Sequence, residues 1–191
     1  SDNRIMEIQA VGRDISDQKI AEKALRNSEE RYRVLIEKAN DGILLLQNGV
    51  FVSSNPSAAS MLGMEPEEVI GMRPEDLSPF YQPDGATSEE KAARLIHQSI
   101  GGSTQVFEWI HLRKDGTEAV IEVSLSRIEL QEEPVLLCFW RDITLRKEAE
   151  RELLLSRTRL RALAESLDRV REEERQNISR EIHDGMGQYI T

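Results

Sequence analysis

The middle of the 191-residue chain carries short apolar or alternating runs bounded by turn residues, the pattern of strands with a buried face. Five segments follow it: residues 42–47, 50–53, 106–112, 118–125 and 135–140. Asn48-Gly49 separates the first two segments, and Asp115-Gly116 separates the third from the fourth. Both dipeptides favour tight hairpin turns, because Asn, Asp and Gly tolerate positive φ angles. We therefore predict one hairpin, followed later in the chain by three more strands.

Three short helices are predicted between the two groups of strands. Asn55-Pro56 opens the first, since proline fits the first helical turn, and residues 65–70 form the second, which a glycine ends. Residues 88–100 form the third, with apolar residues on one face. This order of elements predicts an α+β domain over residues 40–143. We expect a five-stranded antiparallel sheet with helices on one face.

One short motif occurs twice in the chain. Arg-Asp-Ile-Ser at residues 13–16 recurs as Arg-Asp-Ile-Thr at residues 141–144, each time after a strand-like stretch and before a charged helix. We therefore expect residues 1–16 to be the last strand and exit of a preceding domain, so that the chain starts inside that domain. Residues 17–39 are then a linker helix. The polar residues of both motifs are candidate junction residues, with Thr144 as a helix N-cap: Asp14, Ser16, Asp142 and Thr144.

Both charged helices carry apolar or small residues at alternating steps of four and three. These positions are Ala21, Leu25, Ser28, Tyr32, Leu35 and Ala39 in the first helix, and Ala149, Leu153, Ser156, Leu160, Leu163, Leu167 and Val170 in the second. Flanked by Glu, Lys and Arg, such a seam predicts parallel two-stranded coiled coils, the second over residues 144–170. A single amphipathic helix lying on its own domain is the alternative for each.

The second seam is interrupted by the polar residues 171–177. Apolar positions resume out of phase at Ile178, Ile182 and Met186. A phase break of this kind changes the local winding and leaves the packing weakly specified. We expect a weak point in a continuous helix, a solvated linker, or both.

Charge and composition exclude several classes of protein. Lys and Arg number 25 against 35 Asp and Glu, and the net charge of −10 disfavours a nucleic-acid-binding surface. No apolar run reaches the ~18 residues of a membrane span, and no signal peptide opens the chain. A single cysteine and three histidines far apart in sequence exclude a disulfide framework and disfavour a metal site. We expect a cytoplasmic location, with any membrane anchor of the parent protein lying upstream.

The order of elements resembles a PAS domain, and several short segments fit that family. They are Tyr-Arg-Val-Leu at 32–35, Asn-Asp-Gly-Ile at 40–43, Asn-Pro at 55–56, Arg-Lys-Asp-Gly-Thr at 113–117 and the exit motif at 141–144. The resemblance implies the PAS fold, flanked here by long coiled-coil signalling helices. It also implies that the exit motif leads into a signalling helix.

The C-terminal segment, residues 171–191, is similar to the start of the dimerisation and phosphoacceptor helix of sensor histidine kinases. Glu-Ile-His-Asp-Gly-Met-Gly-Gln at residues 181–188 matches the subfamily that carries His-Asp-x-x-x-Gln. By this resemblance His183 is the phosphorylated residue, Asp184 is the adjacent base and orienter, and Gln188 positions water for dephosphorylating a partner. The chemistry fits these roles, because a neutral imidazole is nucleophilic near neutral pH and a carboxylate can orient it.

The resemblance implies that the chain is the sensory and transmitting region of a two-component sensor histidine kinase, which autophosphorylates with ATP and Mg²⁺. The implied partners are a second copy through the coiled coil, a response regulator, and the kinase's own ATP-binding domain. The sequence holds no Gly-rich nucleotide loop and stops eight residues after His183, so we expect this truncated chain to be inactive alone. The alternatives are a PAS receptor for a small ligand or cofactor, and a pure dimerisation scaffold for another output.

The sequence requires no cofactor, and the identity of any cofactor is left open. A flavin-thiol photosensor of this fold needs a cysteine on the helices after the first hairpin, whereas Cys138 lies on the last predicted strand. His97, on the third helix, is the candidate axial ligand for a haem, although a capping or solvent-facing role is favoured. Trp109 is expected to line a pocket or to cap the sheet. His111, on the same strand face, is expected to face the surface or a partner.

Overall fold

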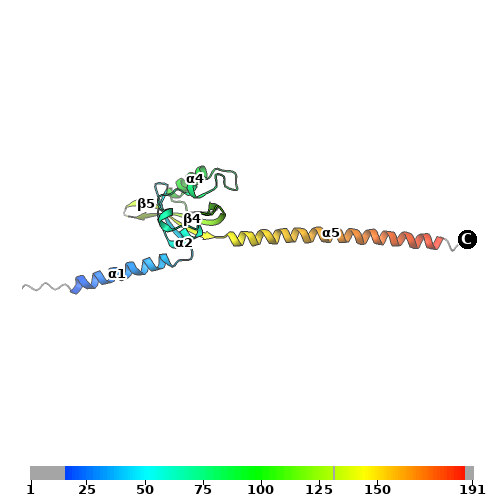
Figure 1. Ribbon diagram of the computed structural model, residues 1–191, viewed down its shortest axis with the longest axis horizontal. Helices are drawn as coiled ribbons and strands as arrows, with labels where there is room; N and C mark the ends of the chain where they lie inside the picture. Colours follow the sequence, from blue (N-terminus) through cyan, green and yellow to red (C-terminus); the bar gives the residue numbers. More distant parts are fainter. Residues whose placement is uncertain (1–15, 131, 188–191) are drawn as a thin grey trace, which may run out of the picture. The chain divides into compact units, whose positions relative to one another are not determined.

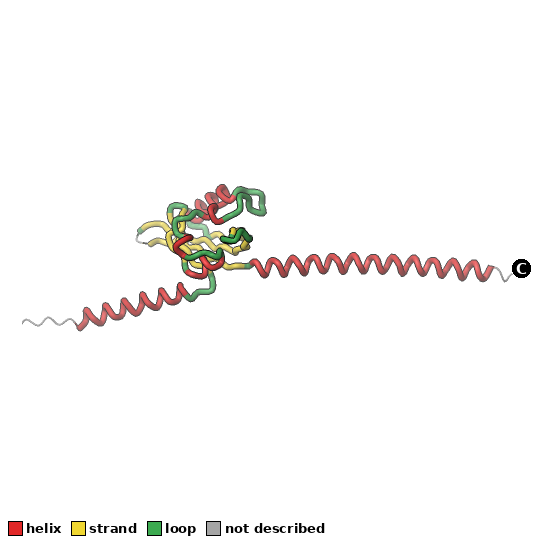
Figure 2. Tube along the Cα trace, viewed as in Figure 1, coloured by secondary structure: helices red, strands yellow, loops and turns green. Residues whose placement is uncertain are grey.

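The computed structural model describes residues 16–130 and 132–187, and the chain divides into two units at the bond between Arg141 and Asp142. The elements up to this boundary are α1 (Ser16–Glu37), β1 (Gly42–Gln47), β2 (Val50–Ser54), α2 (Pro56–Met61), α3 (Pro66–Val69), the 3₁₀ helix η1 (Pro74–Leu77), α4 (Ser88–Ile100), β3 (Gln105–Leu112), β4 (Glu118–Leu130) and β5 (Glu133–Asp142). The second unit is built on helix α5 (Thr144–Gly187). Figure 1 follows these elements along the chain, and Figure 2 separates helices, strands and loops by colour.

The five strands form one antiparallel sheet in the order β2-β1-β5-β4-β3, which confirms the predicted fold class. The β1–β2 hairpin closes through Asn48 and Gly49, whose φ angles of 52° and 80° are both positive, as a type I′ turn requires. β5 pairs with β1, so the last strand lies beside the first in the middle of the sheet. Because Gly42 pairs with Trp140, the chain enters and leaves the sheet at neighbouring positions.

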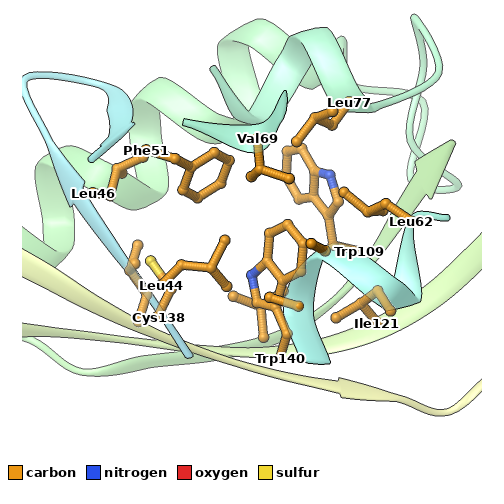
Figure 3. Close-up of a cluster of buried hydrophobic side chains, with 14 of the residues drawn as sticks. Leu44, Leu46, Phe51, Leu62, Val69, Leu77, Trp109, Ile121, Cys138 and Trp140 are labelled. Carbon is orange, nitrogen blue, oxygen red and sulfur yellow. The ribbon is translucent and has the colours of Figure 1, made fainter. Parts of the chain in front are cut away.

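The short helices and one face of the sheet enclose the hydrophobic core. Burial alternates along β5, where Cys138 and Trp140 are buried and the intervening Phe139 is exposed. Figure 3 shows the packed interior, in which the rings of Phe51 and Trp140 meet edge to face with 5.5 Å between their centroids. This period of two is the physical basis of the strand predictions, because it separates a face toward the core from a face toward solvent.

The structure lengthens two predicted strands and adds one element. β4 continues to Leu130 and β5 begins at Glu133, beyond the predicted residues 118–125 and 135–140. Side chains in this outer part of the hairpin are mostly exposed, so the alternation of apolar and polar residues fades there. The 3₁₀ helix η1 spans four residues, which is too short for hydrophobic periodicity to predict. The three predicted helices are present as α2, α3 and α4.

Helices α1 and α5 present the predicted seam residues to solvent. In α1 the side chains of Leu25 and Leu35 are both 61% exposed, and in α5 Leu160 and Leu163 are 63% and 57% exposed. Pairing of either helix in a coiled coil stays a prediction. Over the described ranges, no helix combines the length and the hydrophobicity needed to cross a membrane.

Candidate functional site

An apolar cavity of about 40 Å³ lies between α4 and the inner face of the sheet. Its walls come from every strand, from α4 and from η1: Leu46, Phe51, Pro74, Ala92, Leu95, Ile96, Phe107, Trp109, His111, Val123, Leu125, Cys138 and Trp140. Figure 3 shows Trp109 from β3 and Cys138 and Trp140 from β5 around this interior. A space of this volume holds a water-sized molecule or one of a few heavy atoms.

His111 is the cavity-lining side chain whose ordinary pKa lies closest to neutral pH. Its ring is buried, with Nδ1 3.0 Å from the carbonyl oxygen of Leu77, and it lies 4.3 Å from the Trp140 ring between centroids. Burial lowers the pKa of His111 from 6.5 to about 4, and the hydrogen bond to Leu77 only partly opposes this. The imidazole is therefore neutral at pH 7. We assign its proton to Nδ1, because the facing carbonyl oxygen can only accept a hydrogen bond.

The expectation that His111 faces the surface or a partner is wrong. η1 and the segment after it cover this face of β3, and the covering segment is held by the side chain of buried Gln82. Gln82 Nε2 donates to the carbonyl oxygen of Ile110 at 3.1 Å, and its Oε1 accepts from the backbone N–H of the same residue at 2.9 Å. β3 thus has a buried inner face, although the sequence gives no sign of the segment that covers it.

Ser78 connects the polar atoms beside the cavity. Its Oγ accepts from Trp109 Nε1 at 2.8 Å and donates to the carbonyl oxygen of Pro74 at 2.6 Å. It also lies 3.4 Å from His111 Nδ1. These hydrogen bonds satisfy the indole N–H of a tryptophan that is only 3% exposed, as burial of a polar group requires.

The other residues considered as ligands differ in whether they line the cavity. Trp109 lines the cavity, whereas His97 is exposed in the last turn of α4 and is not among the described lining residues. The Cys138 thiol lines the cavity, and burial raises its pKa to about 12, which keeps it protonated and weakly nucleophilic. No group of three or more His, Cys, Asp or Glu in the described part of the chain is arranged to hold a metal ion.

Two carboxylates, those of Asp41 and Asp142, accept hydrogen bonds where the chain leaves the domain. Arg141 and Asp41 form a bidentate ion pair, with Nε 3.1 Å from Oδ1 and Nη2 2.6 Å from Oδ2. The hydrogen bond from Arg141 lowers the pKa of Asp41 below its usual value, so the carboxylate is charged at neutral pH. One residue later, Asp142 Oδ1 accepts from the backbone N–H of Thr144 at 2.8 Å.

The predicted role of Thr144 as N-cap stays a prediction. Thr144 is already the first residue of α5, and the carboxylate of Asp142 accepts its N–H. An aspartate commonly accepts from the N–H two residues later, and Asp142 in this way takes up one backbone N–H at the start of α5. Both residues nevertheless lie at the strand-to-helix junction, where the sequence predicts them.

The predicted phosphoacceptor segment lies at the far end of α5. Residues 183 and 184 are in the helix, but the side chains of His183 and Asp184 lie outside the described part of the structure. Gln188 and Asp14 are also outside the described residues, and Ser16 begins α1. The roles given to these residues therefore stay predictions.

Asn55 is a functional candidate that sequence reasoning recognises only as a helix start. Its Oδ1 accepts from the backbone N–H of Ile43 at 2.9 Å and of Ala58 at 3.0 Å, and the latter bond caps α2. Its Nδ2 donates to two further carbonyl oxygens, those of Ile36 and Asp41. The Asn-Pro motif signals the cap, but the three bonds made outside α2 depend on tertiary structure.

Comparison with known proteins assigns the fold. Residues 40–145 match the PAS domain family, and the chain belongs to that family. The crystal structure of the PAS domain of an HTR-like protein from Haloarcula marismortui is similar, with a TM-score of 0.54 and 26% sequence identity. The similarity covers 65% of this chain and 99% of that chain.

Two curated relatives are signalling proteins. The chain is 31% identical over 147 residues to sporulation kinase E of Bacillus subtilis. It is 29% identical over 145 residues to the methyl sulfide methyltransferase-associated sensor of Methanosarcina acetivorans. These matches cover 76% and 75% of this chain but 19% and 14% of the relatives, so the chain spans less than a fifth of their length. The chain thus contains a PAS domain and has homology to a sporulation kinase.

Proposed function

We propose that this chain is the sensory and signal-transmitting region of a sensor histidine kinase, in which the PAS domain acts through α5 on the phosphoacceptor His183. The observation that carries the proposal is the continuity of α5. This one helix begins at Thr144, directly after the last PAS strand, and runs to Gly187. Homology to sporulation kinase E supports a kinase as the parent protein.

The length of α5 determines how a movement at the PAS domain can reach His183. At 1.5 Å per residue, about 60 Å of helix separates Thr144 from His183. A lone helix of this length bends, whereas two helices wound together transmit rotation or axial displacement over such a distance. The exposed seam of α5 supports parallel pairing with a second copy. The polar segment at residues 171–177 would then convert a change of packing into a new position for His183.

At the phosphoacceptor, the imidazole of His183 attacks the γ-phosphorus of ATP held by the ATP-binding domain. A nitrogen–phosphorus bond forms as the bond from phosphorus to the β,γ-bridging oxygen breaks, and ADP leaves. Asp184 orients the ring and takes up its other proton. The phosphoryl group passes to a response regulator. In the opposing phosphatase reaction, Gln188 positions a water molecule that attacks the phosphorus on the response regulator and releases inorganic phosphate.

Phosphotransfer in trans tests the proposal. Mixing the chain with the ATP-binding domain of its parent and ATP should give an acid-labile phosphate that the His183→Ala variant loses. His97→Ala, at an exposed histidine of the PAS domain, is the matched control and should keep the label. The same variants in the full-length parent provide the decisive form of the test. A label that survives His183→Ala there, or no label on the full-length protein, would refute the assignment.

The cavity favours a second candidate function, a PAS receptor for a small ligand. Its apolar walls and the neutral imidazole of His111 would suit an uncharged molecule of a few heavy atoms. As a relay, by contrast, the domain would work with this space unoccupied. Native mass spectrometry and an absorbance spectrum of the purified chain separate the two, since only the receptor should retain a bound molecule.

A further inference from the structure

We infer that the PAS domain couples its entry helix α1 to its exit helix α5 through three polar side chains, Asn55, Asp41 and Arg141, with no ligand needed in the cavity. The inference rests on the proposed function for its consequence at His183. The coupling itself acts through hydrogen bonds at the entry and exit of the domain, and it can be measured without measuring phosphorylation of His183.

The first link ties Asn55 to the end of α1. Asn55 Nδ2 donates to the carbonyl oxygen of Ile36 at 2.9 Å and to that of Asp41 at 3.1 Å. Carbonyl groups in the last turn of a helix have no partner within the helix, so Asn55 supplies one. Its Oδ1 is occupied by the backbone N–H groups of Ile43 and Ala58, and the side chain therefore uses all four of its hydrogen-bonding positions. A displacement of the end of α1 must move Asn55 or break one of these bonds.

The second link carries the coupling from the first strand to the last. The backbone carbonyl of Asp41 binds Asn55, while its carboxylate binds Arg141 through two parallel hydrogen bonds. A bidentate pair between a guanidinium and a carboxylate fixes orientation as well as distance. A rotation of the backbone at Asp41 is therefore transmitted to Arg141, which lies 100 residues later in the sequence.

The third link is covalent. Arg141 directly precedes Asp142, whose carboxylate accepts the backbone N–H of Thr144 in the first turn of α5. Every step from Ile36 to Thr144 is thus a hydrogen bond or a short stretch of backbone. The route begins at one helix end and finishes at the start of the other.

The route bypasses the cavity. The described side chains that line the cavity include none of the three relay residues. Arg141 and Asp41 have side-chain exposures of 63% and 38%, and an exposed ion pair contributes little to global stability. Breaking the pair should therefore alter the coupling while the domain stays folded. A domain built in this way can transmit changes from an upstream segment with its own cavity empty.

Amide hydrogen exchange of the whole chain, resolved by NMR, tests the inference. The amide of Lys38, which donates to the carbonyl oxygen of Val34, reports on the end of α1, and the amide of Thr144 reports on the start of α5. Asp41→Asn and Arg141→Gln should each accelerate exchange at both amides by about two- to five-fold, the range expected for an exposed pair. The charge-swapped double variant, Asp41→Arg with Arg141→Asp, should restore slower exchange at both.

Arg146→Gln is the matched control. It breaks the exposed Arg146–Glu150 pair within α5, which lies off the route, and should leave Lys38 unchanged. Unchanged exchange at Lys38 in Arg141→Gln would overturn the inference, as would equal acceleration throughout the sheet or no rescue in the charge-swapped variant. These outcomes are independent of the label on His183, so failure of the inference is distinguishable from failure of the proposed function.

Discussion

The imidazole of His111 lies against the indole of Trp140, with 4.3 Å between ring centroids and 34° between ring planes. Both side chains are buried, one on β3 and the other on β5. Protonation of the imidazole would place a positive charge inside an apolar core, where the desolvation of an ion is unfavourable. The interior of this PAS domain therefore depends on the neutral form of one histidine.

The stability of the domain is expected to fall as the pH is lowered from about 6.5 toward 4. In this window the unfolded chain binds a proton at His111, whereas the folded domain, with a pKa of about 4, does not. The folded-state pKa is depressed, so the stabilisation is complete above the unfolded-state pKa and is lost on acidification. The difference corresponds to about 3 kcal/mol of unfolding free energy at pH 4. Urea unfolding followed by tryptophan fluorescence at several pH values measures it.

Two variants test whether His111 is the source of this pH dependence. His111→Gln should flatten the change of unfolding free energy between pH 7 and 4, even though the variant is less stable overall. His97→Gln, at an exposed position on α4, should keep the wild-type dependence. The same slope in His111→Gln as in the wild type would show that the buried imidazole is not its source.

Gly42 is expected to tolerate no side chain. A Cβ added there would lie 2.9 Å from the Cβ atoms of both Ala58 and Trp140, closer than packed carbon atoms allow. Gly42→Ala should therefore reduce the unfolding free energy by about 1–3 kcal/mol, the range for overpacking. Gly101→Ala is the control, because its added Cβ has no neighbour closer than 3.3 Å and a smaller effect is expected. A Gly42→Ala variant as stable as the wild type in urea would contradict the close packing of α2 on the sheet.

Local signals in the sequence predict much of this fold. Asn48 and Gly49 determine the first hairpin because their preference for positive φ is a property of the residues themselves. The bounds of α4 are predicted equally well, since an apolar face runs along residues 88–100 and two glycines follow it directly in the sequence. The burial of His111 is not predictable in this way. The alternation along the strand places His111 on one face of β3. The segment that covers this face includes η1 and Gln82, which meet β3 only in the folded chain.

The ion pair between Asp41 and Arg141 is likewise not predictable from local signals in the sequence. Asp41 and Arg141 each belong to a segment typical of PAS domains, but their pairing joins residues that are 100 positions apart. Sequence analysis predicts the junction at Asp142 and Thr144 because motif and helix start are adjacent. It does not predict the ion pair, because the proximity of the two residues follows from the pairing of β1 with β5.

Removing the carboxylate at position 142 should uncouple the exit of the domain from α5. In the full-length parent, Asp142→Ala removes the acceptor for the Thr144 N–H and should leave phosphorylation of His183 the same with and without the stimulus. Asp142→Asn retains Oδ1 as an acceptor and should keep the response. Stimulus-dependent labelling of His183 that persists in Asp142→Ala would contradict a relay through this junction.

The seam of α5 predicts which substitutions separate a dimer. Leu160 and Leu163 occupy consecutive seam positions and are 63% and 57% exposed in the single chain, whereas Leu154, at 66%, lies off the seam. A charge at a seam position faces its copy across the coiled coil, so Leu160→Glu with Leu163→Glu should shift the chain to a monomer. Leu154→Glu changes charge and hydrophobicity in the same way but should leave the dimer intact. Sedimentation equilibrium measures both, and equal weakening by the seam and off-seam variants would indicate pairing through a different face of the helix.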